Sequence, residues 1–127
     1  MAARATATSM TVEEYAELLD DGTLHELVRG EVVTLPRPGY EHGYLTASIG
    51  SRLLQHVRER DLGEVVAGDP GFVLADEPAT VRGPDVAFVA KGRDPALRAG
   101  FAQGSPDLAI EIVSPSDAYT RLQEKGA

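Results

Sequence analysis

The sequence predicts an α/β fold in which helices pack against a mixed β-sheet. Helical and strand-like patterns follow one another along the chain, which favours a sheet covered by helices. Two short runs, at 86–90 and 108–113, are almost continuously apolar. Such runs are typical of central strands that are covered on both faces.

A short helix and a hairpin are expected first. Residues 11–14 have the sequence Thr-Val-Glu-Glu, a capping box with Thr11 as N-cap. The helix is predicted over 12–20, where Asp21-Gly22 would end it. Two strand-like runs, at 24–29 and 31–35, then flank Gly30 and indicate a hairpin.

The clearest helical pattern covers residues 42–60, with Leu62-Gly63 expected to close the helix. Apolar side chains recur on one face of it: Leu45, Ile49, Leu53, Leu54 and Val57. The strands predicted after it are 64–67, 72–75, 86–90 and 108–113. A final helix is expected from Ser114, which can cap it, with Pro115 at the first helical position.

Composition limits the classes of function. The 127 residues fit one domain, 11–127, after a disordered tail at 1–10. The chain has no cysteine, which excludes disulfides, thiolate zinc sites and cysteine nucleophiles. Its net charge is −8, whereas a broad nucleic-acid-binding surface is usually basic, so phosphate chemistry would need a local site with a bound cation. No apolar run suggests a membrane span or a secretory signal, so a cytoplasmic location is expected.

Glu111 is the most informative residue, because it interrupts an apolar run. A buried carboxylate costs several kcal/mol unless it is paired, metal-bound or protonated. The alternative is an edge strand on which Glu111 alone faces water. If the runs at 86–90 and 108–113 pair, Asp85 and Glu111 converge on one cation, and oxygen ligands suit Mg²⁺ or Mn²⁺. Asp85 alone could equally be a turn or cap residue.

Pro84-Asp85 followed by Glu111-Ile112-Val113 resembles the signature of PD-(D/E)XK nucleases. Four stretches strengthen the likeness: HELVRGEVV at 25–33, EHGYLTASIGSRL at 41–53, VRGPDVAFV at 81–89 and PDLAIEIVSPSD at 106–117. Together they resemble the Uma-two family of bacterial restriction endonucleases, over residues 11–125.

The resemblance implies a restriction-endonuclease-like fold and divalent-cation-dependent cleavage of DNA. It implies that Asp85, Glu111 and the Ile112 carbonyl hold Mg²⁺ or Mn²⁺, with Glu26 as a further contributor. In the nuclease signature a lysine usually lies two residues after the glutamate, and Val113 occupies that position here. The resemblance therefore implies that a lysine on the following helix, Lys125, takes the catalytic role, ahead of Lys91. His42 matches a family position and is expected to contact substrate.

Each of these residues also has an ordinary structural interpretation. Lys125 can be a solvated surface charge, Glu26 an outward residue of its strand, and His42 a structural residue at a helix start. The chain ends two residues after Lys125, where the family usually has another strand and helix. An exposed sheet edge left by a missing strand would favour a homodimer.

Three functions therefore stay open: a DNA endonuclease, a non-catalytic dimeric binding module of the same fold, and a hydrolase of small phosphorylated substrates.

Overall fold

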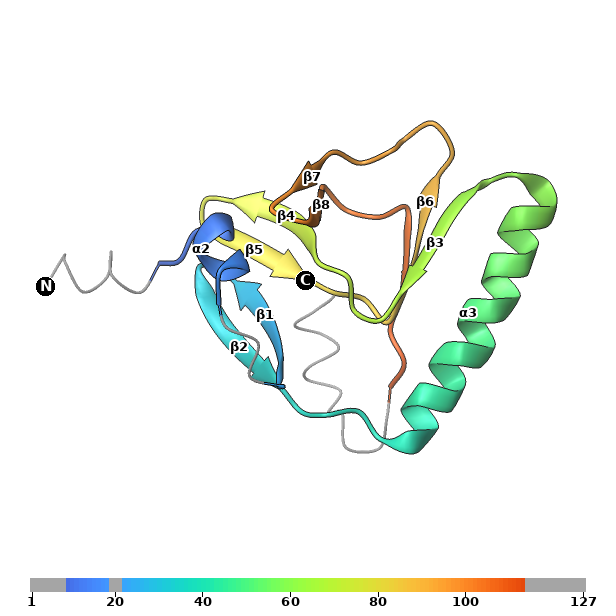
Figure 1. The fold of residues 1–127 in the computed structure, drawn as a ribbon, viewed down its shortest axis with the longest axis horizontal. Helices are drawn as coiled ribbons and strands as arrows, with labels where there is room; N and C mark the ends of the chain where they lie inside the picture. The colour runs from blue at the N-terminus through green and yellow to red at the C-terminus, as the bar shows by residue number, and fades with distance from the viewer. Residues whose placement is uncertain (1–8, 19–21, 114–127) are drawn as a thin grey trace, which may run out of the picture. The chain divides into compact units, whose positions relative to one another are not determined.

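The computed structural model describes residues 9–18 and 22–113, and these form two compact units (Figure 1). Unit 1 contains the described residues up to 37, together with Gly71–Gly83 and Pro95–Ser105. Unit 2 contains Pro38–Pro70, Pro84–Asp94 and the described residues from 106 onward. Neither helix in the described part of the chain combines the length and hydropathy needed to span a membrane.

Unit 1 is a six-stranded sheet with one short helix, α2 (Val12–Ala16). The sheet order is β2-β1-β5-β4-β8-β7. Its strands are β1 (Leu24–Val28), β2 (Glu31–Leu35), β4 (Phe72–Asp76), β5 (Ala79–Arg82), β7 (Leu97–Arg98) and β8 (Phe101–Gln103). Only β4 and β8 pair in parallel, so this sheet is mixed, as expected from the sequence.

The start of unit 1 follows the predicted local chemistry. Thr11 Oγ1 accepts from the Glu14 amide, and the Glu14 carboxylate accepts from the Thr11 amide, which confirms the capping box. Arg29 and Gly30 both have positive φ, 51° and 83°, and form the two-residue hairpin turn between β1 and β2. At the φ of Gly30 an L side chain is strained, and a Cβ there would also lie 3.2 Å from the Ser9 Cα atom, so the turn favours glycine.

A small apolar core stabilises unit 1. It consists of Val12, Leu27, Val73, Ala79 and Val81, each no more than 3% exposed. Burying side chains of this size contributes about 1.5–3 kcal/mol each, except for the alanine. The core therefore joins α2 to the strands of the first sheet.

Unit 2 combines the long helix α3 (Tyr40–Arg60) with a three-stranded antiparallel sheet of order β3-β6-β9. The strands are β3 (Gly63–Ala67), β6 (Val86–Ala90) and β9 (Leu108–Ile110), and α3 packs on β3 and β6. The central, largely buried position of β6 confirms the expectation for the run at 86–90.

Several predicted boundaries were wrong. Helix α2 ends at Ala16 rather than at residue 20, because the Glu17 amide already bonds back to Glu14 and Tyr15 as a C-cap. Helix α3 begins at Tyr40 rather than at His42 and ends at Arg60 as predicted, but its C-cap is Asp61, in the left-handed conformation, and not the Leu62-Gly63 pair. Gly63 instead opens β3, where a Cβ would lie 2.1 Å from the Val89 carbonyl oxygen.

The run at 108–113 is not a buried central strand. Within the described residues, β9 pairs with β6 alone and ends at Ile110, and Leu108 and Val113 are 45% and 53% exposed. The predicted pairing of this run with 86–90 is nevertheless confirmed. The final helix from Ser114, Lys125 and residues 1–8 of the predicted tail lie outside the described residues.

Candidate functional site

Asp85 lies at the entrance to the central strand of unit 2. Its neighbours Val86 and Ala87 are fully buried, and Asp85 itself is only 6% exposed. Its backbone carbonyl accepts from the Gly68 amide, which ties the start of β6 to the end of β3. A charged side chain is thus buried at a fixed point of the sheet, where ionisation requires partners.

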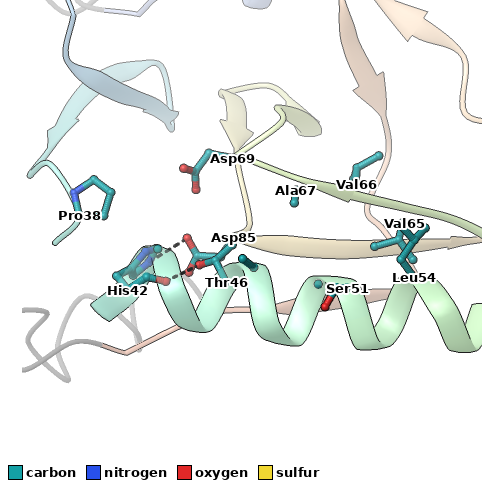
Figure 2. Close-up of a pocket in the computed structure, with 14 residues that line it drawn as sticks. Pro38, His42, Thr46, Ser51, Leu54, Val65, Val66, Ala67, Asp69 and Asp85 are labelled. Atoms are coloured by element: carbon teal, nitrogen blue, oxygen red, sulfur yellow. Dashed lines mark hydrogen bonds and ion pairs between the residues drawn. The ribbon is translucent and has the colours of Figure 1, made fainter. Parts of the chain in front are cut away.

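Both oxygens of the Asp85 carboxylate have such partners. The Ile112 amide donates to Oδ2 at 2.7 Å. The Nε2 atom of His42 lies 3.1 Å from Oδ1 (Figure 2). The Ile112 contact comes from the segment after β9 and the His42 contact from the first turn of α3. Three segments that are distant in sequence therefore meet at one carboxylate.

The pairing of β6 with β9 also determines the location of Glu111. The last pair of the ladder is Val86 with Ile110, so Asp85 and Glu111 are the next residues beyond that pair, one on each strand. Glu111 is partly buried, and Ile112, which follows it, is 7% exposed. The structure thus brings the backbone of the predicted Glu111-Ile112 pair directly beside Asp85.

A cavity of about 520 Å³ in unit 2 opens onto Asp85 and His42. Its walls are made by one face of α3 and by β3, and most of its lining is apolar or small, including Leu54, Val66 and Ala67 (Figure 2). Volumes between about 300 and 1,000 Å³ are usual for small-molecule sites. Within the described part of the chain, Asp69 is the other carboxylate in the wall, and the wall contains no lysine or arginine.

Glu26, the second buried carboxylate, lies in unit 1 on β1 and is 4% exposed. Its Oε2 accepts from the Gly83 amide at 3.0 Å, and its Oε1 lies 3.9 Å from the Arg82 guanidinium. Burial and, next, the charge of Glu26 raise the pKa of Tyr15, whose hydroxyl donates to the His25 carbonyl. These contacts hold the Glu26 carboxylate in place within unit 1.

The two lysines differ in what the structure says of them. Lys91 lies at the surface of unit 2, where it forms an ion pair with Asp61, so its position favours a surface role. Lys125 lies outside the described residues.

Asp107 anchors the start of β9 to β6. Its Oδ2 accepts from the Ala90 amide at 2.7 Å and from Arg93 at 2.8 Å, and its own amide donates to the Phe88 carbonyl. The hydrogen bond from Ala90 and, after it, the charge of Arg93 lower the pKa of Asp107. This anchor holds the strand that leads to Glu111.

The donor set at Asp85 fits a divalent cation with few protein ligands. No group of three or more histidine, aspartate or glutamate side chains in residues 9–18 and 22–113 is placed to hold a metal ion. Mg²⁺, however, usually takes one or two carboxylates and keeps several waters. A carboxylate accepts at about four positions, so the two contacts of Asp85 leave it acceptor capacity for a cation.

The contact between His42 and Asp85 was not predicted from the sequence, where His42 was assigned to substrate. A signal for it existed: His42 lies in the first turn of a helix whose apolar face was expected to pack on the strands. A polar side chain near that face needs a buried partner.

Comparison with known proteins agrees with the fold. A family model described as "Putative restriction endonuclease", Uma2, matches residues 12–127. A crystal structure of a putative nuclease belonging to DUF820 from Anabaena variabilis is similar in fold, with a TM-score of 0.74 and 20% identity. The match covers 91% of this chain but only 65% of that one. No curated protein matched the sequence. The match over residues 12–127 shows that the chain belongs to the Uma2 family of restriction-endonuclease-like proteins.

Proposed function

We propose that this protein is a divalent-metal-dependent endonuclease that hydrolyses DNA phosphodiester bonds. The observation that supports this most is the buried Asp85 carboxylate, contacted on both oxygens and adjacent in the strand pairing to Glu111. Membership of a family whose model is described as "Putative restriction endonuclease" supports the reaction class.

In this proposal Asp85, Glu111 and the Ile112 carbonyl hold Mg²⁺ or Mn²⁺. Such an ion, when bound, supplies Lewis-acid activation of the scissile phosphate and of the attacking water. The carboxylates of Asp85 and Glu111 would hold the positive charge of the cation at a fixed place. The buried surroundings of Asp85 limit competition from bulk water for that carboxylate. Lys125 is proposed, from the family resemblance, to offset charge on the phosphate in the transition state.

Because the chain is acidic, the dependence of DNA binding on salt concentration is informative. With a net charge of −8, DNA affinity depends on local arginine contacts and falls steeply as salt increases. A second candidate is a hydrolase of small phosphorylated substrates, which the 520 Å³ cavity next to Asp85 favours by its size. Homodimer formation and a cytoplasmic location stay predictions from the sequence.

A cleavage assay tests the proposal. Supercoiled plasmid and a small phosphodiester are incubated at low salt with Mg²⁺, with Mn²⁺, or with EDTA. The proteins compared are the wild type, Asp85→Ala, Glu111→Ala and, as control, Glu64→Ala, which removes an exposed carboxylate of β3.

Plasmid cleavage that needs the cation and is lost in the first two variants alone supports the endonuclease. Cleavage of the small substrate alone supports the second candidate. No cleavage of either substrate, or cleavage unaffected by both substitutions, contradicts the proposed site.

A further inference from the structure

His42 is fixed against Asp85 by the fold of unit 2. It lies in the first turn of α3, a helix of 21 residues that packs on β3 and β6. The Thr46 hydroxyl donates to the His42 carbonyl at 2.8 Å, which adds a side-chain bond to that turn (Figure 2). The ring is therefore carried by a rigid element, which is what precise positioning of a site requires.

The contact between His42 and Asp85 joins an imidazole nitrogen to a carboxylate oxygen. Nε2 of His42 lies 3.1 Å from Oδ1 of Asp85, a distance at which an Nε2–H group can donate to that oxygen. The side chains of His42 and Asp85 are 11% and 8% exposed, respectively, so water competes little for this contact. The Nε2 atom is engaged by Asp85, which disfavours its use as a substrate contact.

The two donors act on different oxygens of Asp85. His42 contacts Oδ1 from the helix, and the Ile112 amide contacts Oδ2 from the segment after β9. With one donor on each oxygen, the carboxylate cannot rotate about its Cβ–Cγ bond without losing both contacts. Cation sites commonly depend on such outer contacts, because these orient the ligating group.

We propose that His42 is a positioning residue, which orients the Asp85 carboxylate for a divalent cation through the contact from Nε2 to Oδ1. This inference rests on the proposed function, because it takes Asp85 as a ligand. It differs from the expectation that His42 contacts substrate, and it predicts an effect of His42 on cation affinity when no substrate is present.

The test is calorimetric titration of Mn²⁺ into the full chain, in the wild type, His42→Gln, His42→Asn and Asp85→Ala. A glutamine amide nitrogen can occupy the place of Nε2, whereas the shorter asparagine cannot reach it. We expect His42→Gln to retain Mn²⁺ affinity within about threefold, and His42→Asn to lose about 10- to 100-fold. The control is His56→Asn on the same helix, where the ring is exposed and contacts Arg60.

Thermal unfolding of each variant is followed in parallel, so that a loss of fold is not mistaken for a loss of orientation. Rescue by glutamine but not asparagine, in folded variants, supports the inference. Equal affinity in the wild type and His42→Asn, with binding abolished in Asp85→Ala, overturns the inference and leaves the proposed site intact. A wild type that binds no Mn²⁺ overturns the proposed cation site and the role of His42 with it.

Discussion

Two carboxylates are buried among the residues that the structure describes, Glu26 in unit 1 and Asp85 in unit 2, and they differ in their partners and surroundings. Each accepts a hydrogen bond from a backbone amide, Glu26 from Gly83 and Asp85 from Ile112. Glu26 also faces the positive charge of Arg82 and lies within a strand of the six-stranded sheet. Asp85 faces His42 instead, precedes its strand, and lines a cavity.

This difference shows that burial of a carboxylate does not by itself indicate a catalytic site. An arginine supplies a permanent countercharge, which stabilises a buried carboxylate within the fold. A histidine and an amide next to a cavity fix the carboxylate without a permanent countercharge, which leaves its charge available to a cation. The predictions below test whether Glu26 is structural and Asp85 functional.

The largest effect is expected at Asp85. Asp85→Asn keeps the shape of the side chain but removes its charge, so Mg²⁺-dependent cleavage should fall by more than about 100-fold, beyond the usual cost of altering an outer contact. Initial rates of plasmid nicking measure this change. Full activity in a folded Asp85→Asn protein would place the reaction elsewhere.

At Glu26 the expected loss is in stability rather than in cation binding. Glu26→Ala removes the acceptor of the Gly83 amide and the carboxylate nearest Arg82, and should lower the free energy of unfolding by about 3 kcal/mol. Urea denaturation measures this change.

Glu26→Gln is the matched variant, because its amide oxygen can still accept from Gly83. It should bind Mn²⁺ as the wild type does. A tenfold weaker affinity would instead support the role as a metal ligand that the family resemblance implies for Glu26.

A smaller effect is expected from the anchor at Asp107. Hydrogen bonding to Ala90 and the charge of Arg93 hold its pKa below the ordinary value of 3.8. The ionised Asp107 carboxylate therefore stabilises the fold at pH values above its ordinary pKa. This stabilisation is lost as the pH falls through the lowered pKa of the folded protein. Asp107→Asn should be less stable than the wild type at neutral pH and should lose less stability on acidification.

Denaturation curves at several pH values measure the effect at Asp107. Asp94→Asn, which alters an exposed aspartate of the same unit, is the control. Identical pH dependence in the wild type and Asp107→Asn would show that the anchor contributes nothing in solution.

Local sequence signals predicted the elements that local chemistry controls. The capping box at Thr11, the turn at Gly30 and the long helix lie where they were expected, although Arg29, predicted in the first strand, belongs to the turn. The short strands β5, β7 and β8 were missed, because two to four residues show no clear periodicity and their pairing depends on distant segments.

At the candidate site, Asp85 and Glu111 were singled out because a carboxylate next to an apolar run is costly without a partner. The strand pairing that brings their backbones together was expected, although β9 is shorter and more exposed than predicted. The contact from His42 could not be derived from spacing, because it depends on how α3 packs against the sheet.

The central claim is that Asp85 and Glu111 share one divalent-cation site. It is tested most directly by calorimetric titration of Mn²⁺ into the wild type, Asp85→Ala, Glu111→Ala and the Glu64→Ala control. One binding event in the wild type and the control, lost in both Asp85→Ala and Glu111→Ala, is the predicted result. Wild-type affinity in either of the first two variants would contradict the shared site.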